Sequence, residues 1–157
     1  MSTRLQAVCL PKEKRDGVTR PYADRLLAAL RIVAGILFME GGVFVLFHWP
    51  ASTLPQPPAS MAGWMLAAGL FELIGGALLV IGLLTRPTAF VLSGMMAVAY
   101  WGFHVSAGPW PVTNMGVAAI LYCFIFLYLA AAGPGAWAVD NRSPRAAPDC
   151  QPTEVIR

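Results

Sequence analysis

Four ionisable side chains stand inside stretches that are otherwise apolar: Arg31, Glu40, Glu72 and His104. In hydrocarbon each costs about 2.5–3.5 kcal/mol unless it pairs with another group or faces an aqueous cavity. Carboxyl and imidazole groups in such places exchange protons or hydrogen-bond a small ligand. We therefore take Glu40, Glu72 and His104, together with the amide of Asn114, as the candidate buried polar site.

The elements that hold these residues follow from composition. The chain is 57% hydrophobic and only 12% charged, so lipid suits it better than water. Most charges lie near the two ends and at Arg86, and proline-containing breaks separate four apolar stretches of nearly the length that crosses a bilayer. We predict an all-α integral membrane four-helix bundle with helices at about 25–47, 61–84, 87–106 and 112–132. The whole domain is expected over 25–137, between flexible tails at 1–24 and 138–157.

Orientation follows from the basic residues. They precede the first stretch, occur at Arg86 and follow the fourth stretch, whereas segments 48–60 and 106–111 contain none. Short cytoplasmic loops collect lysine and arginine. Both termini are therefore predicted to be cytoplasmic, in a multi-pass protein of the cell (inner) membrane.

The depths of the polar residues bear on whether they meet. At 1.5 Å per residue, Glu40 lies about 20 Å and Glu72 about 18 Å above the cytoplasmic ends of their helices. His104 lies about 25 Å up the third helix, and Asn114 begins the fourth near the outer face. A polar cluster in the outer half of the bundle is thus compatible with the spacing. The alternative, that each residue only packs or hydrogen-bonds within the protein, stays open.

Arg31 and Arg86 are interpreted as structural or interfacial charges. Arg31 precedes Glu40 by nine residues, which at about 100° per residue places the two on opposite faces of the first helix. Two interpretations of Arg31 stay open: its side chain extends to the cytoplasmic headgroups, or it pairs with Glu72 from the second helix.

Small residues indicate close helix packing, because they let neighbouring backbones approach. The glycines assigned this role are Gly35, Gly69, Gly75, Gly76 and Gly82. A kink in the first helix at Gly41 and Gly42 is the alternative for that pair.

Several classes of function find no support. The net charge of +3 is explained by cytoplasmic flanks, so no nucleic-acid partner is expected. The candidate ligands for a metal are spread over three helices, and no metal site is assigned. The three cysteines form no C-x-x-C pair, which argues against a catalytic dithiol.

Longer motifs carry a family resemblance. The run from Glu72 to Leu79, followed by Gly82 to Arg86, resembles the central signature of the DoxX family. The stretch from Asn114 to Trp137, closing with Asp140, is similar to that family's last helix and exit turn. The chain departs from the pattern at 114–117, where many relatives read Asn-Gly-Gly-Glu, and at Glu40, where relatives often carry histidine.

The resemblance implies a four-helix membrane protein from a family whose named members are subunits of quinol oxidase or thiosulfate:quinone oxidoreductase assemblies. It predicts a membrane subunit or accessory of a quinone-linked redox complex, associated with an oxidoreductase rather than a stand-alone enzyme. A quinone is the candidate cofactor, no catalytic residue is assigned, and the expected partners are the lipid bilayer and either other subunits of the complex or a homo-oligomer. Two alternatives stay open: a non-enzymatic assembly or scaffold protein, and a small-solute carrier or channel.

Overall fold

The computed structural model describes residues 20–51 and 58–142, and in these residues it contains helices and no strand. The four α-helices are α1 (Arg20–Phe47), α2 (Ala62–Ile81), α3 (Thr85–Ala99) and α4 (Val117–Ala132). Three helical segments are long and apolar enough to cross a membrane, Tyr22–Phe47, Ala59–Ile81 and Thr85–Ala107. The 16 residues of α4 are also apolar but span only about 24 Å. The all-α membrane fold predicted from the sequence is confirmed.

Helix ends differ from the predicted ones for local reasons. α1 begins at Arg20, inside the segment predicted as a tail. α2 ends three residues before the predicted 84, because Gly82 adopts a left-handed conformation (φ 69°) that closes the helix. α3 then starts at Thr85, and Pro87 falls in its first turn, where no helical hydrogen bond to its nitrogen is needed.

The outer ends of α3 and α4 are less regular than predicted. α3 continues into a π-helical turn, η2 (Tyr100–His104), and a 3-10 turn, η3 (Val105–Ala107). α4 starts at Val117 and not at 112, because the preceding residues form a turn whose amides bond to the carbonyls of Trp110 and Pro111. Asn114 therefore belongs to this turn and does not begin the helix.

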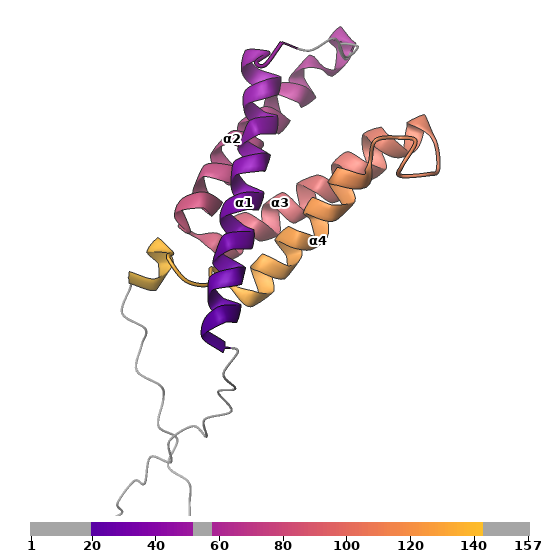
Figure 1. The fold of residues 1–157 in the computed structure, drawn as a ribbon. Coiled ribbons are helices and arrows are strands. Elements are labelled where there is room, and N and C mark those ends of the chain that lie inside the picture. Colours follow the sequence, from indigo (N-terminus) through magenta and orange to yellow (C-terminus); the bar gives the residue numbers. More distant parts are fainter. Residues whose placement is uncertain (1–19, 52–57, 143–157) are drawn as a thin grey trace, which may run out of the picture.

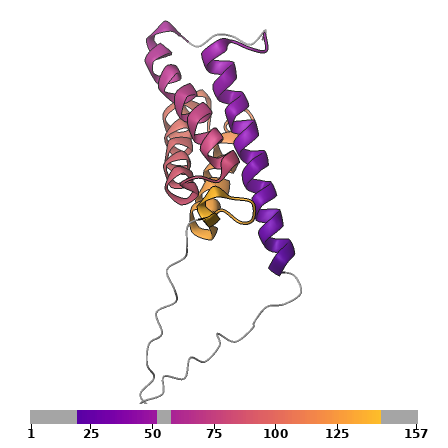
Figure 2. The same cartoon turned by 90° about the vertical axis from the view of Figure 1, so that its left-hand side faces the viewer.

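The helices form two pairs, α1 with α2 and α3 with α4 (Figure 1). The pairs lie close together where α2 turns into α3 and diverge toward the opposite end. A C-terminal 3-10 turn, η4 (Val139–Arg142), lies beneath the converging end, as Figure 2 shows from the side. This arrangement leaves the space between the pairs widest near the α1–α2 and α3–α4 connections.

Glycines mediate the contact between α1 and α2. A Cβ atom built on Gly35 would lie 2.9 Å from the carbonyl oxygen of Gly76, and one on Gly76 would lie 2.7 Å from that of Gly35. Side chains of α1 pack on Gly69, and Leu92 of α3 packs on Gly75 at 2.8 Å from such an atom. α1 is one continuous helix through its glycine pair at 41 and 42. These glycines therefore set how closely α2 approaches its neighbours.

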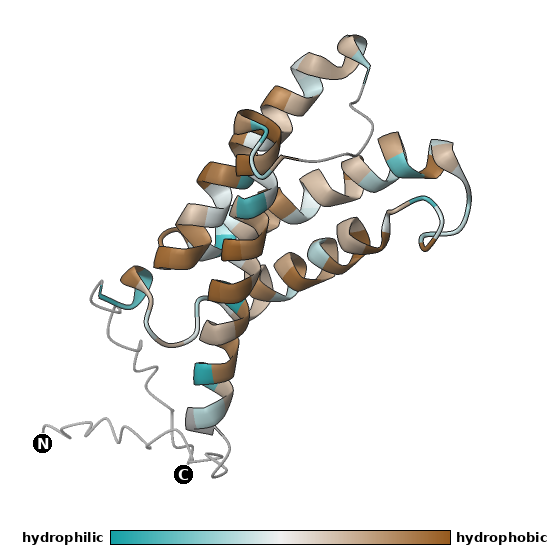
Figure 3. Cartoon of the chain, turned by 45° about the horizontal axis from the view of Figure 1, so that its top comes forward, coloured by the Kyte–Doolittle hydropathy of each residue, from teal (hydrophilic) through white to brown (hydrophobic). Residues whose placement is uncertain are grey.

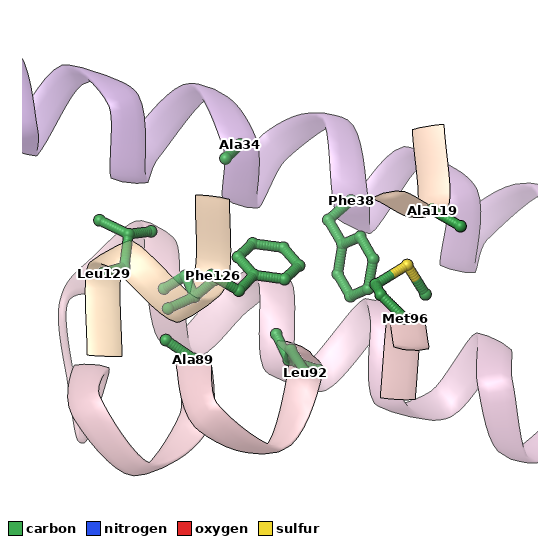
Figure 4. Packing of buried hydrophobic residues seen from close by; sticks show 9 residues of the cluster. Ala34, Phe38, Ala89, Leu92, Met96, Ala119, Phe126 and Leu129 are labelled. Atoms are coloured by element: carbon green, nitrogen blue, oxygen red, sulfur yellow. The ribbon is translucent and has the colours of Figure 1, made fainter. Parts of the chain in front are cut away.

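The buried core is small, and two phenylalanines meet within it. Phe38 of α1 and Phe126 of α4 meet edge to face with ring centroids 4.9 Å apart, and Leu92 and Met96 of α3 lie beside the pair (Figure 4). Many large apolar residues of all four helices are exposed. Figure 3, coloured by hydropathy, shows that hydrophobic residues predominate along the helices. An outward apolar surface of this extent is suited to lipid and not to water.

Arg31 is fully buried, and neither interpretation drawn from the sequence describes it. Its guanidinium donates hydrogen bonds to the carbonyl oxygens of Val80 (2.9 Å) and Leu79 at the end of α2. It also donates to Pro134 (2.8 Å) and to two further carbonyls of the loop after α4. The last carbonyls of a helix lack intrahelical partners, and the five donors of an arginine suit such a group of acceptors. Arg31 thus joins α1, α2 and the exit of α4.

Asp140 secures the same end of the bundle from below. Its carboxylate accepts hydrogen bonds from the backbone N–H groups of Leu84 and Thr85, both 2.8 Å, at the start of α3. Partial burial opposes ionisation, but these hydrogen bonds and the charge of Arg31 outweigh it, so the pKa of Asp140 lies below its ordinary value. The folded domain therefore runs to Arg142 and not to 137, which corrects the predicted start of the C-terminal tail.

Arg86 is exposed at this end and donates to the carbonyl oxygens of Ala130 (3.2 Å) and Ala131 (2.9 Å), which close α4. It thereby ties the start of α3 to the end of α4. The remaining predicted tails, 1–19 and 143–157, lie outside the described residues.

Candidate functional site: a cavity within the bundle

A cavity of about 420 Å³ lies between the two helix pairs, and its walls come from all four helices. Most of the lining is apolar, and the titratable residues in it are Glu72, His104 and Tyr122. The volume falls within the range of about 300–1,000 Å³ that is typical of small-molecule sites. An apolar pocket with a few converging polar groups is the usual form of a ligand-binding site.

Glu72 is the most deeply placed of these groups. It lies nine residues from Ile81 and ten from Ala62, so each end of α2 is about 14–15 Å away. Its Oε2 atom is buried and has no hydrogen-bond partner among the described residues. The carboxyl group packs on Gly41 of α1, where an added Cβ would lie 3.0 Å from Oε2. The missing side chain at Gly41 thus makes room for this carboxyl group.

His104 stands in the π-helical turn that follows α3. Its Nδ1 atom lies 2.9 Å from the backbone oxygen of Asn114. Because a carbonyl oxygen only accepts, Nδ1 carries a hydrogen in this arrangement, and Nε2 is the other nitrogen of the ring. Such π-helical turns are frequent at functional sites.

Asn114 positions His104 and does not itself line the cavity. Its side-chain oxygen accepts from the N–H of Gly116 (2.8 Å), and its side-chain nitrogen donates to the carbonyl of Gly108 (2.8 Å). The buried amide therefore holds the turn whose carbonyl orients the imidazole.

Tyr122 is a cavity residue that the sequence analysis did not assign. It stacks on Phe126 at a centroid distance of 5.4 Å and meets Phe38 at 5.3 Å, which holds its ring against the core. It also lies within electrostatic range of both Glu40 and Glu72. The available signal was its position as a polar residue inside the apolar run of α4.

Glu40 does not belong to the cavity, which corrects the predicted cluster. Leu37, Gly41 and Val45 form the α1 wall, whereas Glu40 is exposed on the outside of the bundle. Successive residues of a helix are about 100° apart, so the neighbour of a cavity-lining residue faces elsewhere. Of the three predicted ionisable residues, only Glu72 and His104 share the cavity.

The cavity also reaches the outer surface of the helices. Leu37 (50% exposed), Trp64 (67%) and Met115 (72%) each line it and face outward. The lining of the cavity is therefore continuous with the outer surface of the helices at these three residues.

The structure thus defines a helical membrane protein with a largely apolar cavity that holds a buried carboxyl, an imidazole and a phenol. The family model of DoxX matches residues 26–105. The chain belongs to the DoxX family, as the sequence motifs predicted.

Curated relatives agree with this class. An uncharacterized protein of Haemophilus influenzae is 40% identical over 126 residues, which cover 78% of this chain and 92% of the relative. An uncharacterized membrane protein of Mycobacterium tuberculosis is 26% identical over 159 residues, with 85% and 96% of the two chains covered. The inner membrane protein YqjF of Escherichia coli is 29% identical over 112 residues, with 71% and 86% covered. No solved structure matches the chain.

Proposed function

We propose that this protein is a membrane subunit of a quinone-linked redox complex and that its cavity binds the quinone headgroup. The observation that carries the proposal is the buried Oε2 atom of Glu72, which lacks a hydrogen-bond partner among the described residues and lies beside the cavity. A lipid-soluble ligand fits the apolar walls and the openings toward the bilayer. When bound, a quinone supplies two-electron, two-proton redox chemistry.

Each polar group has a role that its geometry supports. Glu72 in its protonated form donates from the carboxyl to a ligand oxygen, and Tyr122 donates from its hydroxyl. His104, held through Nδ1, accepts a proton at Nε2 or donates one when the ring is charged. Met65, Phe103 and Met115 supply apolar and aromatic surface on which a flat ring packs.

The proposal extends to location. We assign both termini to the cytoplasm, since Arg25, Arg86 and Arg142 all flank the converging end of the bundle. Trp64, Trp101 and Trp110 lie toward the opposite end, where aromatic side chains mark the other interface. The name of the Escherichia coli relative supports the inner membrane.

The test is quinone binding by the purified protein in mild detergent. Bound quinone is extracted and measured, and rebinding of decylubiquinone is titrated for the native chain, Glu72→Leu and Tyr122→Phe. Losing one hydrogen bond to the ligand is expected to weaken binding about three- to tenfold. Tyr128→Phe is the matched control, because Tyr128 faces outward on the same helix (57% exposed) and should bind as the native chain does.

Equal binding by all four proteins, or no binding by any, would exclude the cavity as a quinone site. The alternative of a non-enzymatic scaffold protein would then be favoured, because the polar groups would have only a packing role.

A further inference from the structure

Glu40 occupies an unusual position, within the membrane-spanning part of α1 (Tyr22–Phe47) and exposed on the outside of the bundle. The next residue, Gly41, packs against Glu72, and an added Cβ on Gly42 would lie 2.7 Å from the backbone nitrogen of Leu73. Glu40 is therefore level with the centre of α2, as far from either end of that helix as a residue can be. At this depth an outward side chain faces hydrocarbon.

The surface around Glu40 is otherwise suited to lipid. Val33, Ile36 and Leu37 are 55%, 53% and 50% exposed. Together with Glu40 they follow the i, i+3, i+4, i+7 spacing of one helical stripe, and we call these four residues the Glu40 face. A carboxyl group at the end of an apolar stripe within the spanning part of the helix is unfavourable in lipid alone and requires a partner group.

Among the described residues, no positively charged side chain is placed to form an ion pair with Glu40. The donors of Arg31 are directed to backbone carbonyls, and this side chain is buried nine residues nearer the converging end. Arg86 lies at that end and contacts α4. Among residues 20–51 and 58–142, a basic side chain at the level of Glu40 is therefore absent.

A second copy of the chain would not solve this problem. A two-fold symmetric contact between Glu40 faces would place two carboxyl groups against each other. Since the described residues place no positive charge beside Glu40, a different molecule is the source that we consider.

We propose that the Glu40 face docks a transmembrane helix of another protein that carries a lysine or arginine at the level of Glu40. Two opposite charges that are each unfavourable in lipid stabilise one another when they meet there, and the apolar residues of the face supply packing beside them. The proposal concerns the outside of α1 and holds whether or not the cavity binds a quinone.

The experiment uses the full chain with a donor fluorophore in phosphatidylcholine vesicles. The probe is a synthetic helix of about twenty leucines with one central lysine and an acceptor fluorophore, compared with the all-leucine helix. Energy transfer should give an affinity for the lysine helix about tenfold higher than for the leucine helix. Glu40→Leu should abolish that preference, and Glu40→Gln should retain only a small part of it.

Tyr128→Phe removes an outward polar group on α4 and should leave the preference unchanged. Thermal unfolding of the Glu40 variants, followed by tryptophan fluorescence, shows that they are folded and does not depend on whether the cavity binds a quinone. Equal affinity for the two helices, or an unchanged preference in Glu40→Leu, would overturn the proposal. A dimer of the native chain that dissociates in Glu40→Leu would also overturn it, because a second copy would then occupy the face.

Discussion

Replacement of Arg31 tests the main structural argument about the converging end of the bundle. In Arg31→Met the hydrogen bonds to the end of α2 and to the loop after α4 are lost together. Methionine keeps similar length and fills the space with apolar atoms, so the change isolates the polar contacts.

The size of the effect follows from the number of acceptors. Five carbonyl oxygens accept hydrogen bonds from the guanidinium, and each hydrogen bond contributes about 0.5–1.5 kcal/mol net to stability. Part of that sum is offset, because the variant no longer has to bury a charge. We expect a loss of about 3–5 kcal/mol, which lowers the unfolding midpoint of a chain of this size by roughly 10 °C.

Tryptophan fluorescence in mild detergent measures the midpoint, and Trp137, whose carbonyl is one of the acceptors, is a local probe. Arg25→Met is the matched control, since Arg25 is exposed on the same helix and should change stability by less than about 0.5 kcal/mol. Arg31→Lys should recover only part of the loss, because an ammonium has three donors and lacks the planar fork. If Arg31→Met matched Arg25→Met in stability, the interpretation of Arg31 as the link between α1, α2 and the exit of α4 would be refuted.

Three further outcomes are expected. Gly76→Val should destabilise the α1–α2 contact by about 1–3 kcal/mol in thermal unfolding, because its Cβ would meet a carbonyl oxygen at 2.7 Å. Gly94→Val is the control, since Gly94 has open space around it and the change should not destabilise this contact. Equal unfolding midpoints for the two variants would contradict the packing argument. Asp140→Asn should cost about 1 kcal/mol by weakening the cap of α3. Because the pKa of Asp140 is lowered in the folded state, its contribution to folding stability is present above the unfolded-state pKa and is lost as pH falls through the folded-state pKa. The unfolding midpoints of the native chain and of Asp140→Asn should therefore converge in strong acid. A difference that stays constant with pH would contradict an origin in the ionised carboxylate. Gly41→Leu should lower decylubiquinone binding more than Glu72→Leu does, since its side chain displaces the carboxyl group and enters the cavity. Unchanged titrations would show that this wall does not contact the ligand.

Much of the fold could be predicted from local patterns. The apolar stretches and prolines locate the four helices, and the glycine positions indicate where α1 and α2 approach. The start of α4 was predicted five residues early, because apolar residues around Asn114 look helical in hydropathy while the amide of Asn114 favours a turn. Hydropathy does not distinguish an apolar turn from an apolar helix.

The candidate site could be predicted only in part. Depth along a helix follows from counting residues, and it correctly brought Glu72 and Glu40 to one level. Which way each carboxyl points depends on the rotation of α1 against its neighbours, and this rotation is decided by contacts such as that of Gly35 with Gly76. The assignment of Glu40 to the cluster was wrong for this reason.

Sequence alone determines that this chain is a helical membrane protein of the DoxX family, because composition, helix breaks and motifs are local properties of the chain. Only the tertiary structure decides that Glu72 and His104 share a cavity, that Glu40 faces outward, and that Arg31 binds backbone carbonyls. The first two facts depend on how the helices rotate and pack against one another. The third depends on backbone carbonyl groups at helix ends, which every residue type carries and which the sequence therefore does not reveal.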